Sequence, residues 1–352
     1  MYFDIMSDVS KFEYEGTLVF NGIYQTKSSQ EEIDLSEIGT EGLSNFERGQ
    51  PGEERSGFAG INFSQYTSKY EDLDESLEKT VDHYIATRFR EEEYNQPDEL
   101  VDDEGEPTSG WERTTDESYL YWKHPDQIFL QGSHGKVGRL KKKLNENWSG
   151  TVKLEPLEFD PDFLLYLMKE FDDSNRIRGI RIESLTDAQM SGTISSHGQH
   201  NEVRDSSNIT ESLPVIAGTL LNYKFEELEG TFSFEGFKIT ANIQTKVRDY
   251  RTGRIHIKVE NSIENSPHLV RTLISLYFLR RLVGLYESWK NMNPTERYVH
   301  PEYFARLHRR ATELPQSAEY DFPLRELVDD YAEKREEDID VEELEWGSHS
   351  DT

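Results

Sequence analysis

Residues 237–259 alternate apolar and polar side chains with a period of two, which is typical of β-strands that have one buried face. Glu235-Gly236 and the segment 250–253 have the composition of turns, so residues 228–260 predict a three-stranded antiparallel meander. If Val247 lies opposite Ile255, then Arg248 faces Arg254 and Lys246 faces His256. The apolar residues of the alternation are Phe237, Ile239, Ala241, Ile243, Val247, Ile255, Ile257 and Val259.

A long helix is predicted directly after the meander. Ser266 and Pro267 form a helix start, and residues 269–289 are apolar nearly all round. Such a helix can cover the apolar face of the meander. We therefore expect an α+β fold, with an antiparallel meander packed on a long apolar helix and a second β-plus-helix region at the N-terminus.

The pattern along the chain predicts three parts. Residues 1–120 form an N-terminal β-plus-helix region with acidic loops, residues 121–310 an α+β domain that holds the meander, and residues 311–352 an acidic C-terminal tail, mobile like the N-terminus. In the first part Asn21-Gly22 predicts a hairpin turn and residues 77–94 predict a helix. Residues 95–118 are acidic and turn-rich, which predicts an exposed insertion.

The net charge is −30, from 39 Lys and Arg against 69 Asp and Glu. The acidic residues are spread along the whole chain, and 12% of the residues are aromatic, which is enough material for packed cores. In molar salt the Debye length falls to about 3 Å, so such a surface repels itself little. The composition favours a halophilic protein over a mimic of nucleic acid, because a mimic would concentrate its charge on one face.

Several classes of protein are disfavoured by what the sequence lacks. Without cysteine there is no disulfide, thiolate nucleophile or thiolate metal site. There is no apolar run of 18 residues and no signal-peptide pattern, so we expect a soluble cytoplasmic protein without a membrane partner. We find no catalytic motif and expect neither a cofactor nor a metal site, although His197 and His200 lie close together in a polar loop. A carboxylate or histidine active site cannot be recognised among so many acidic residues.

Residues 132–144, GSHGKVGRLKKKL, are the most basic short stretch of this acidic chain. Two residues separate Gly132 from Gly135 and Val137 follows Lys136, so the stretch lacks the spacing and the Ser or Thr of a P-loop. It resembles the GXXG loop of KH domains, which contacts a nucleic-acid backbone, although Gly138 stands where that family has an apolar residue. The alternative is an ordinary helix with solvated lysines.

The polar face of the meander predicts a surface for a polyanion. Its basic residues would lie beside one another across strands, which destabilises a sheet unless something neutralises them, and Tyr250 could stack on a base. The candidate nucleic-acid-binding residues are Lys246, Arg248, Tyr250, Arg251, Arg254, His256 and Lys258 of the meander, with Lys136, Arg139 and Lys142 of the basic stretch.

Two functions follow from these residues. The first is a non-catalytic nucleic-acid-binding protein of a halophilic cytoplasm that uses the basic face of the meander. The second is an interaction or scaffold subunit of a larger assembly, in which the basic face docks an acidic partner or the chain's own acidic segments, such as 95–118 or the tail.

The first function predicts binding that survives salt only if arginines contact phosphates bidentately. Each simple phosphate contact lowers the logarithm of the binding constant by about 0.9 per tenfold rise in salt. Single- and double-stranded nucleic acid should bind the wild type up to molar salt, and charge reversal at Lys246, Arg248, Arg254 and Lys258 should abolish binding. The absence of binding at every salt concentration would contradict this function.

Overall fold

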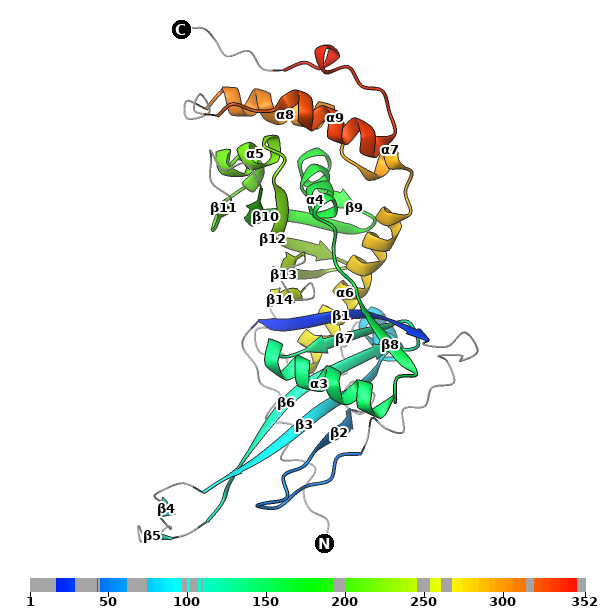
Figure 1. Ribbon diagram of the computed structural model, residues 1–352, viewed down its shortest axis with the longest axis vertical. Helices are drawn as coiled ribbons and strands as arrows, with labels where there is room; N and C mark the ends of the chain where they lie inside the picture. Colours follow the sequence, from blue (N-terminus) through cyan, green and yellow to red (C-terminus); the bar gives the residue numbers. More distant parts are fainter. Residues whose placement is uncertain are drawn as a thin grey trace. The chain divides into compact units, whose positions relative to one another are not determined.

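The computed structural model describes residues 17–28, 43, 45–61, 75–96, 100–101, 107–108, 110–192, 200–245, 254–260, 268–314 and 320–346. The chain folds into two compact units, one formed by residues 18–157 and one that begins at Glu158 (Figure 1). Antiparallel strands and helices occur in both units, which confirms the predicted α+β class. None of the helices in the described part of the chain is long and apolar enough to cross a bilayer.

The first unit is an antiparallel sheet with helix α3 on one side. Its strands pair in the order β8, β1, β7, β6, β3, β2. Their bounds are β1 Leu18–Ser28, β2 Ser56–Ile61, β3 Ile85–Asn95, β6 Glu112–Lys123, β7 Gln127–Gln131 and β8 Val152–Pro156, with a small separate pair of β4 Leu100–Val101 and β5 Pro107–Thr108. The helices are α2 Glu75–Val81 and α3 His134–Asn147.

Helix α3 covers the centre of this sheet because its apolar residues recur at helical spacing. Val137, Leu140 and Leu144 are buried on one stripe of the helix. Trp148 follows the helix and packs on Trp122 of β6, with 5.4 Å between ring centroids. The core of this unit is therefore closed by the same helix that carries the basic stretch.

Three predictions for the first unit are wrong. Residues 77–94 are not one helix, because α2 ends at Val81 and β3 runs from Ile85 between β2 and β6. Asn21-Gly22 is not a hairpin turn but lies inside β1 at a β-bulge, where Asn21 Nδ2 donates to the Gly132 carbonyl at 2.6 Å. Residues 95–118 are not all an insertion, because residues 112–118 form the start of β6 and pair with β3 up to Asn95.

The second unit contains the sheet of the meander. Its strands pair antiparallel in the order β11, β10, β12, β13, β14, and β9 pairs with β10. Their bounds are β9 Arg176–Ile177, β10 Ile180–Ser191, β11 His200–Val203, β12 Lys224–Phe234, β13 Phe237–Gln244 and β14 Arg254–Glu260. The buried face of this sheet carries Phe232, Ile239, Ala241, Ile243, Ile255 and Ile257.

Helices α4 and α6 pack on that buried face (Figure 1). Phe278 of α6 contacts Phe232 of β12 at 5.3 Å between ring centroids, and Phe163 of α4 contacts Trp289 of α6 at 5.5 Å. Asp160 caps α4 by accepting from the backbone N–H of Asp162, and Pro161 stands at the first helical position. The helices are α4 Pro161–Asp173, α5 Leu213–Leu220, α6 His268–Lys290, α7 Pro294–Arg297, α8 Pro301–Thr312 and α9 Leu324–Arg335, with short 3₁₀ helices at Ile209–Glu211 and Val341–Glu343.

The segment 311–352, expected to be an acidic tail, contains the packed helix α9. Leu327, Val328 and Tyr331 are buried, and the Tyr331 ring lies 4.7 Å from that of Phe304 on α8. The Tyr331 hydroxyl donates to Asp162 of α4 at 2.7 Å. A helix with one apolar stripe remains packed although its other faces are acidic.

Candidate functional site

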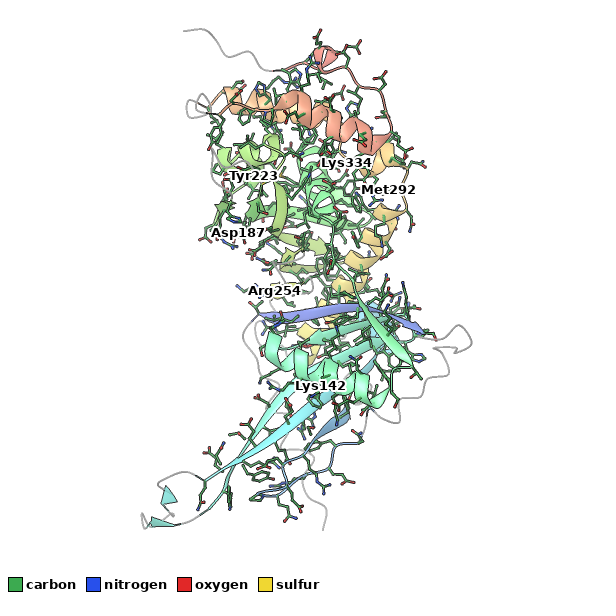
Figure 2. The ribbon with its side chains drawn as sticks, in the orientation of Figure 1. Lys142, Asp187, Tyr223, Arg254, Met292 and Lys334 are labelled. Atoms are coloured by element: carbon green, nitrogen blue, oxygen red, sulfur yellow. The ribbon has the colours of Figure 1, made fainter. Side chains whose placement is uncertain are left out.

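The structure describes part of the predicted nucleic-acid-binding set. Lys246, Arg248, Tyr250 and Arg251 lie outside the described residues. Arg254, His256 and Lys258 lie on β14 of the second unit, and Lys136, Arg139 and Lys142 lie on α3 of the first. Figure 2 labels Arg254 and Lys142.

The predicted register of the meander is wrong. Ile243, not Val247, lies opposite Ile255, so Arg254 faces Gln244, His256 faces Asn242 and Lys258 faces Thr240. The alternation predicted which residues share a face. It could not predict the register, because a shift of the strand pairing by an even number of residues leaves every side chain on the same face. The described basic residues therefore face neutral polar partners across β13 rather than like charges.

Acidic residues from β10 and β12 lie on the same polar face. Glu227 and Asp187 are nearly buried there, with 9% and 12% of their side chains exposed, and the Arg204 guanidinium pairs with both, at 3.4 Å from Asp187. Arg204 also contacts Glu202 at 2.8 Å. The pairing neutralises carboxylates that would otherwise be costly to bury.

A chain of amides links these carboxylates to β14. Asn242 Nδ2 donates to Glu227 at 2.9 Å and to Glu229 at 3.1 Å, while Gln244 Nε2 donates to Glu227 at 2.8 Å. The Gln244 amide oxygen in turn accepts from Arg254 Nε. Arg254 thus belongs to a hydrogen-bonded row that runs across four strands, which orients its guanidinium along the sheet.

Two titratable groups on this face have shifted pKa values. Burial raises the pKa of Glu229, and the charges of Asp187 and Glu227 raise it further against the Asn242 hydrogen bond. Burial lowers the pKa of His256, and the charge of Arg254 lowers it further. His256 is therefore neutral near pH 7, and the face has one cation fewer than the sequence predicted.

The basic residues of α3 neutralise a carboxylate pair on the neighbouring ribbon. Glu91 of β3 and Asp116 of β6 lie directly opposite each other, an arrangement that is destabilising when nothing balances the charges. Arg139 bridges them, at 2.5 Å from Glu91 and 3.2 Å from Asp116, and Lys136 contacts Asp116 at 2.7 Å. This explains why so acidic a chain keeps a basic helix at this point.

Two further lysines of the basic stretch contact other residues of the first unit. Lys141 lies over the Tyr24 ring at 4.6 Å, and Lys143 pairs with Glu146 at 3.4 Å. Lys142 is exposed. The stretch follows strand β7 rather than a helix, so it departs further from the GXXG loop of KH domains.

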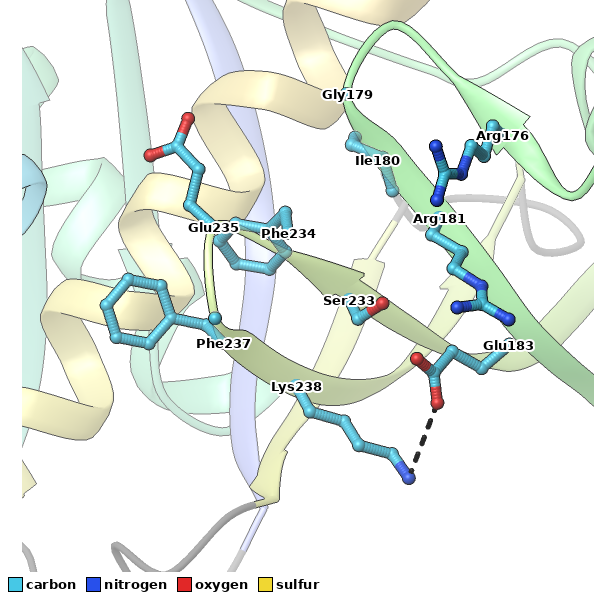
Figure 3. A pocket seen from close by; sticks show the side chains of 11 residues that line it. Arg176, Gly179, Ile180, Arg181, Glu183, Ser233, Phe234, Glu235, Phe237 and Lys238 are labelled. Atoms are coloured by element: carbon cyan, nitrogen blue, oxygen red, sulfur yellow. Dashed lines mark ion pairs between the residues drawn. The ribbon is translucent and has the colours of Figure 1, made fainter.

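A cavity of about 450 Å³ lies at the end of the second sheet, where the β9–β10 hairpin meets the β12–β13 turn (Figure 3). Its basic lining residues are Arg176, Arg181 and Lys238. The sequence contained no motif for it, because the lining comes from strands whose order along the sheet is not local information. Alternation along "KFEELEGTF" could have placed Glu227 and Glu229 on a polar face, but not beside Asp187.

Within the described part of the chain, no group of three or more His, Asp and Glu side chains could hold a metal ion. No family model matches the chain, and no curated protein is significantly similar to it.

The charge pair across β3 and β6 gives a pH-dependent prediction. The hydrogen bond from Lys136 holds the pKa of Asp116 below its usual range, and the Arg139 charge adds to this against partial burial. This stabilisation is present above the unfolded pKa of Asp116 and is lost as the pH falls through the folded pKa. K136Q/R139Q should lower the unfolding free energy by about 0.5–1 kcal/mol at pH 7, and the difference should vanish in acid.

Urea unfolding from pH 7 to pH 2 measures this difference. K142Q, on the same helix but without an ion pair among the described residues, is the matched control and should have no effect. If the unfolding free energy of K136Q/R139Q stays below that of the wild type by the same amount in acid, the two cations do not stabilise the unit through the carboxylates.

Proposed function

We propose that the chain is a non-catalytic interaction subunit that binds a basic protein partner at the outer end of its β3–β6 ribbon. The observation that carries the proposal is Trp111, just before β6. It is 54% exposed and is the only exposed large apolar side chain among the residues that the structure describes. Tryptophan is enriched among the residues that dominate binding energy at protein interfaces, which makes Trp111 a candidate anchor for a partner.

The ribbon has one covered and one open face. On the covered face, Glu92 accepts from the Gly49 N–H at 2.6 Å and pairs with Arg113 at 3.1 Å, and the Tyr94 hydroxyl donates to the Gly49 carbonyl at 2.8 Å. Residues of the opposite alternation are open: Glu93 lies across from Thr114 and Asn95 across from Glu112, all four exposed. These contacts on the covered face hold the strands that carry the exposed residues of the open face.

The charge of the open face indicates the chemistry of the partner. Further along the ribbon Glu91 and Asp116 have their cations from α3, whereas Glu93 and Glu112 form no ion pair among the described residues. The sequence between the two strands contains six further acidic residues, Asp98, Glu99, Asp102, Asp103, Glu104 and Glu106. A surface of tryptophan and unpaired carboxylates is complementary to a protein with basic residues around an apolar pocket.

The same charges argue against nucleic acid at this ribbon, because phosphates would be repelled. Nucleic-acid binding by the meander remains a second hypothesis, since Lys246, Arg248, Tyr250 and Arg251 lie outside the described residues. We further propose that the chain works in a salt-rich cytoplasm. Screening would then weaken the contribution of Glu93 and Glu112, and Trp111 would supply most of the affinity.

The test compares partners of the wild type with those of W111A. A photo-crosslinking residue at position 111 should trap a basic protein in extracts of the native cells, and the affinity for that protein is then measured with purified components. W111A should weaken binding by about 30-fold, corresponding to about 2 kcal/mol. E93Q/E112Q should weaken it several-fold at low salt and less in molar salt.

The matched control is D82A, a change at an exposed residue in the turn after α2 of the same unit. It should bind like the wild type. A partner that binds W111A and the wild type equally would contradict the proposal, as would crosslinking that is no stronger at position 111 than at position 82.

A further inference from the structure

Two arginines lie directly opposite each other in the β9–β10 hairpin. Arg178 and Gly179 form its turn, with φ of 45° and 85°, as in the type I′ turns that join antiparallel strands. Ile177 and Ile180 pair next to the turn and are buried, so Arg176 and Arg181, the next pair, lie on the opposite face of the sheet.

The arginine pair is part of a row that continues across the sheet. Arg181 lies opposite Ser233 of β12, and Ser233 lies opposite Lys238 of β13. Neighbouring strands are about 4.8 Å apart, so the four side chains are near neighbours on one face. In Figure 3 Arg176, Arg181, Glu183 and Lys238 follow one another along one side of the cavity, with the Arg181 guanidinium between Arg176 and Glu183.

Neither acidic side chain that lines this cavity forms an ion pair with the two arginines among the described residues. Glu235 is bound by Arg281 and by the Tyr277 hydroxyl, and in Figure 3 it points away from the arginines. Glu183 pairs with Lys238 at 3.7 Å. Among the described residues neither Arg176 nor Arg181 forms an ion pair, although the chain as a whole carries a charge of −30. Like charges opposite each other destabilise a sheet unless an anion lies between them.

We propose that this cavity binds the phosphate group of a small phosphomonoester between Arg176 and Arg181. Guanidinium groups match phosphate oxygens bidentately, and the Ser233 hydroxyl beside Arg181 can donate a further hydrogen bond. The volume of about 450 Å³ is in the range of small-molecule sites. Ile180, Phe234 and Phe237 also line the cavity, but they are buried and belong to the opposite face of the sheet, so the polar side chains carry the recognition of the ligand. This site lies in the second unit and does not depend on a partner at Trp111.

The experiment is titration calorimetry of the full chain with glucose 6-phosphate, inorganic phosphate, succinate and a ten-residue single-stranded DNA. The wild type should bind both phosphates, with the phosphomonoester tighter than succinate and DNA. R176Q/R181Q should weaken phosphate binding by at least about 30-fold, because two charge-assisted contacts are lost. K238Q, which leaves Glu183 without its cation, should weaken it several-fold. R325Q, a change at an exposed arginine of the same unit, should have no effect.

A second measurement keeps the proposal testable without the ligand. In low salt without phosphate, R176Q/R181Q should raise the melting temperature by about 1–3 °C, because it removes repulsion between the strands. Phosphate should raise the melting temperature of the wild type but not that of the variant. No phosphate binding by the wild type, or equal binding by the variant, would overturn the proposal. Tighter binding of DNA than of the phosphomonoester would overturn the ligand class.

Discussion

The pairing of carboxylates on the sheets with a few cations is the constraint on which both units depend. A chain with 69 acidic and 39 basic residues must place carboxylates on its sheets, and antiparallel pairing brings some of them together. In the first unit Arg139 and Lys136 balance Glu91 and Asp116. In the second unit Arg204 balances Glu227 and Asp187. Each cation reaches its carboxylates from a different element, so the charge balance also fixes how these elements pack.

Because these cations neutralise carboxylates of their own unit, a cluster of basic residues in this chain does not by itself indicate a binding site. A basic helix in an acidic protein suggests a site for a polyanion, but Lys136 and Arg139 are engaged inside their own unit. Helix α8 follows the same rule, because Arg306 pairs with Asp173 at 2.5 Å and Arg310 with Asp172 at 2.9 Å. The informative charges are those left over once such pairs are removed. Among the described residues they include the carboxylates beside Trp111 and Arg176 and Arg181 of the β9–β10 hairpin.

Much of the fold could be predicted from local patterns in the sequence. Period-two alternation predicted β13 and β14. The stripe of Val137, Leu140 and Leu144 and the Asp160-Pro161 pair are local patterns typical of the helices α3 and α4 that contain them. Residues 85–94 were assigned wrongly because Ile85 and Phe89 fit a helical spacing, whereas pairing with β2 and β6 makes this segment a strand. Tertiary pairing overrides local preference most readily in such short segments.

The candidate site could be predicted less well, because its geometry is set by pairs distant in the sequence. The face that carries Arg254 and His256 was predicted, but their partners depend on a register that alternation leaves open. Asp187 and Arg204 come from β10 and the segment after β11, and no local signal indicates that they meet Glu227 of β12. To predict that Arg176 and Arg181 lie opposite each other, one would have to know the position of the two-residue turn between them.

A double-mutant cycle on Arg204 and Glu227 tests the central claim most directly. The unfolding free energies of R204Q, E227Q and the double variant would be measured in urea at low and at molar KCl. Because Glu227 is nearly buried, we predict a coupling energy of about 1–3 kcal/mol that largely survives molar salt. Additivity of the two substitutions within about 0.3 kcal/mol would contradict the claim that paired carboxylates hold the sheet together.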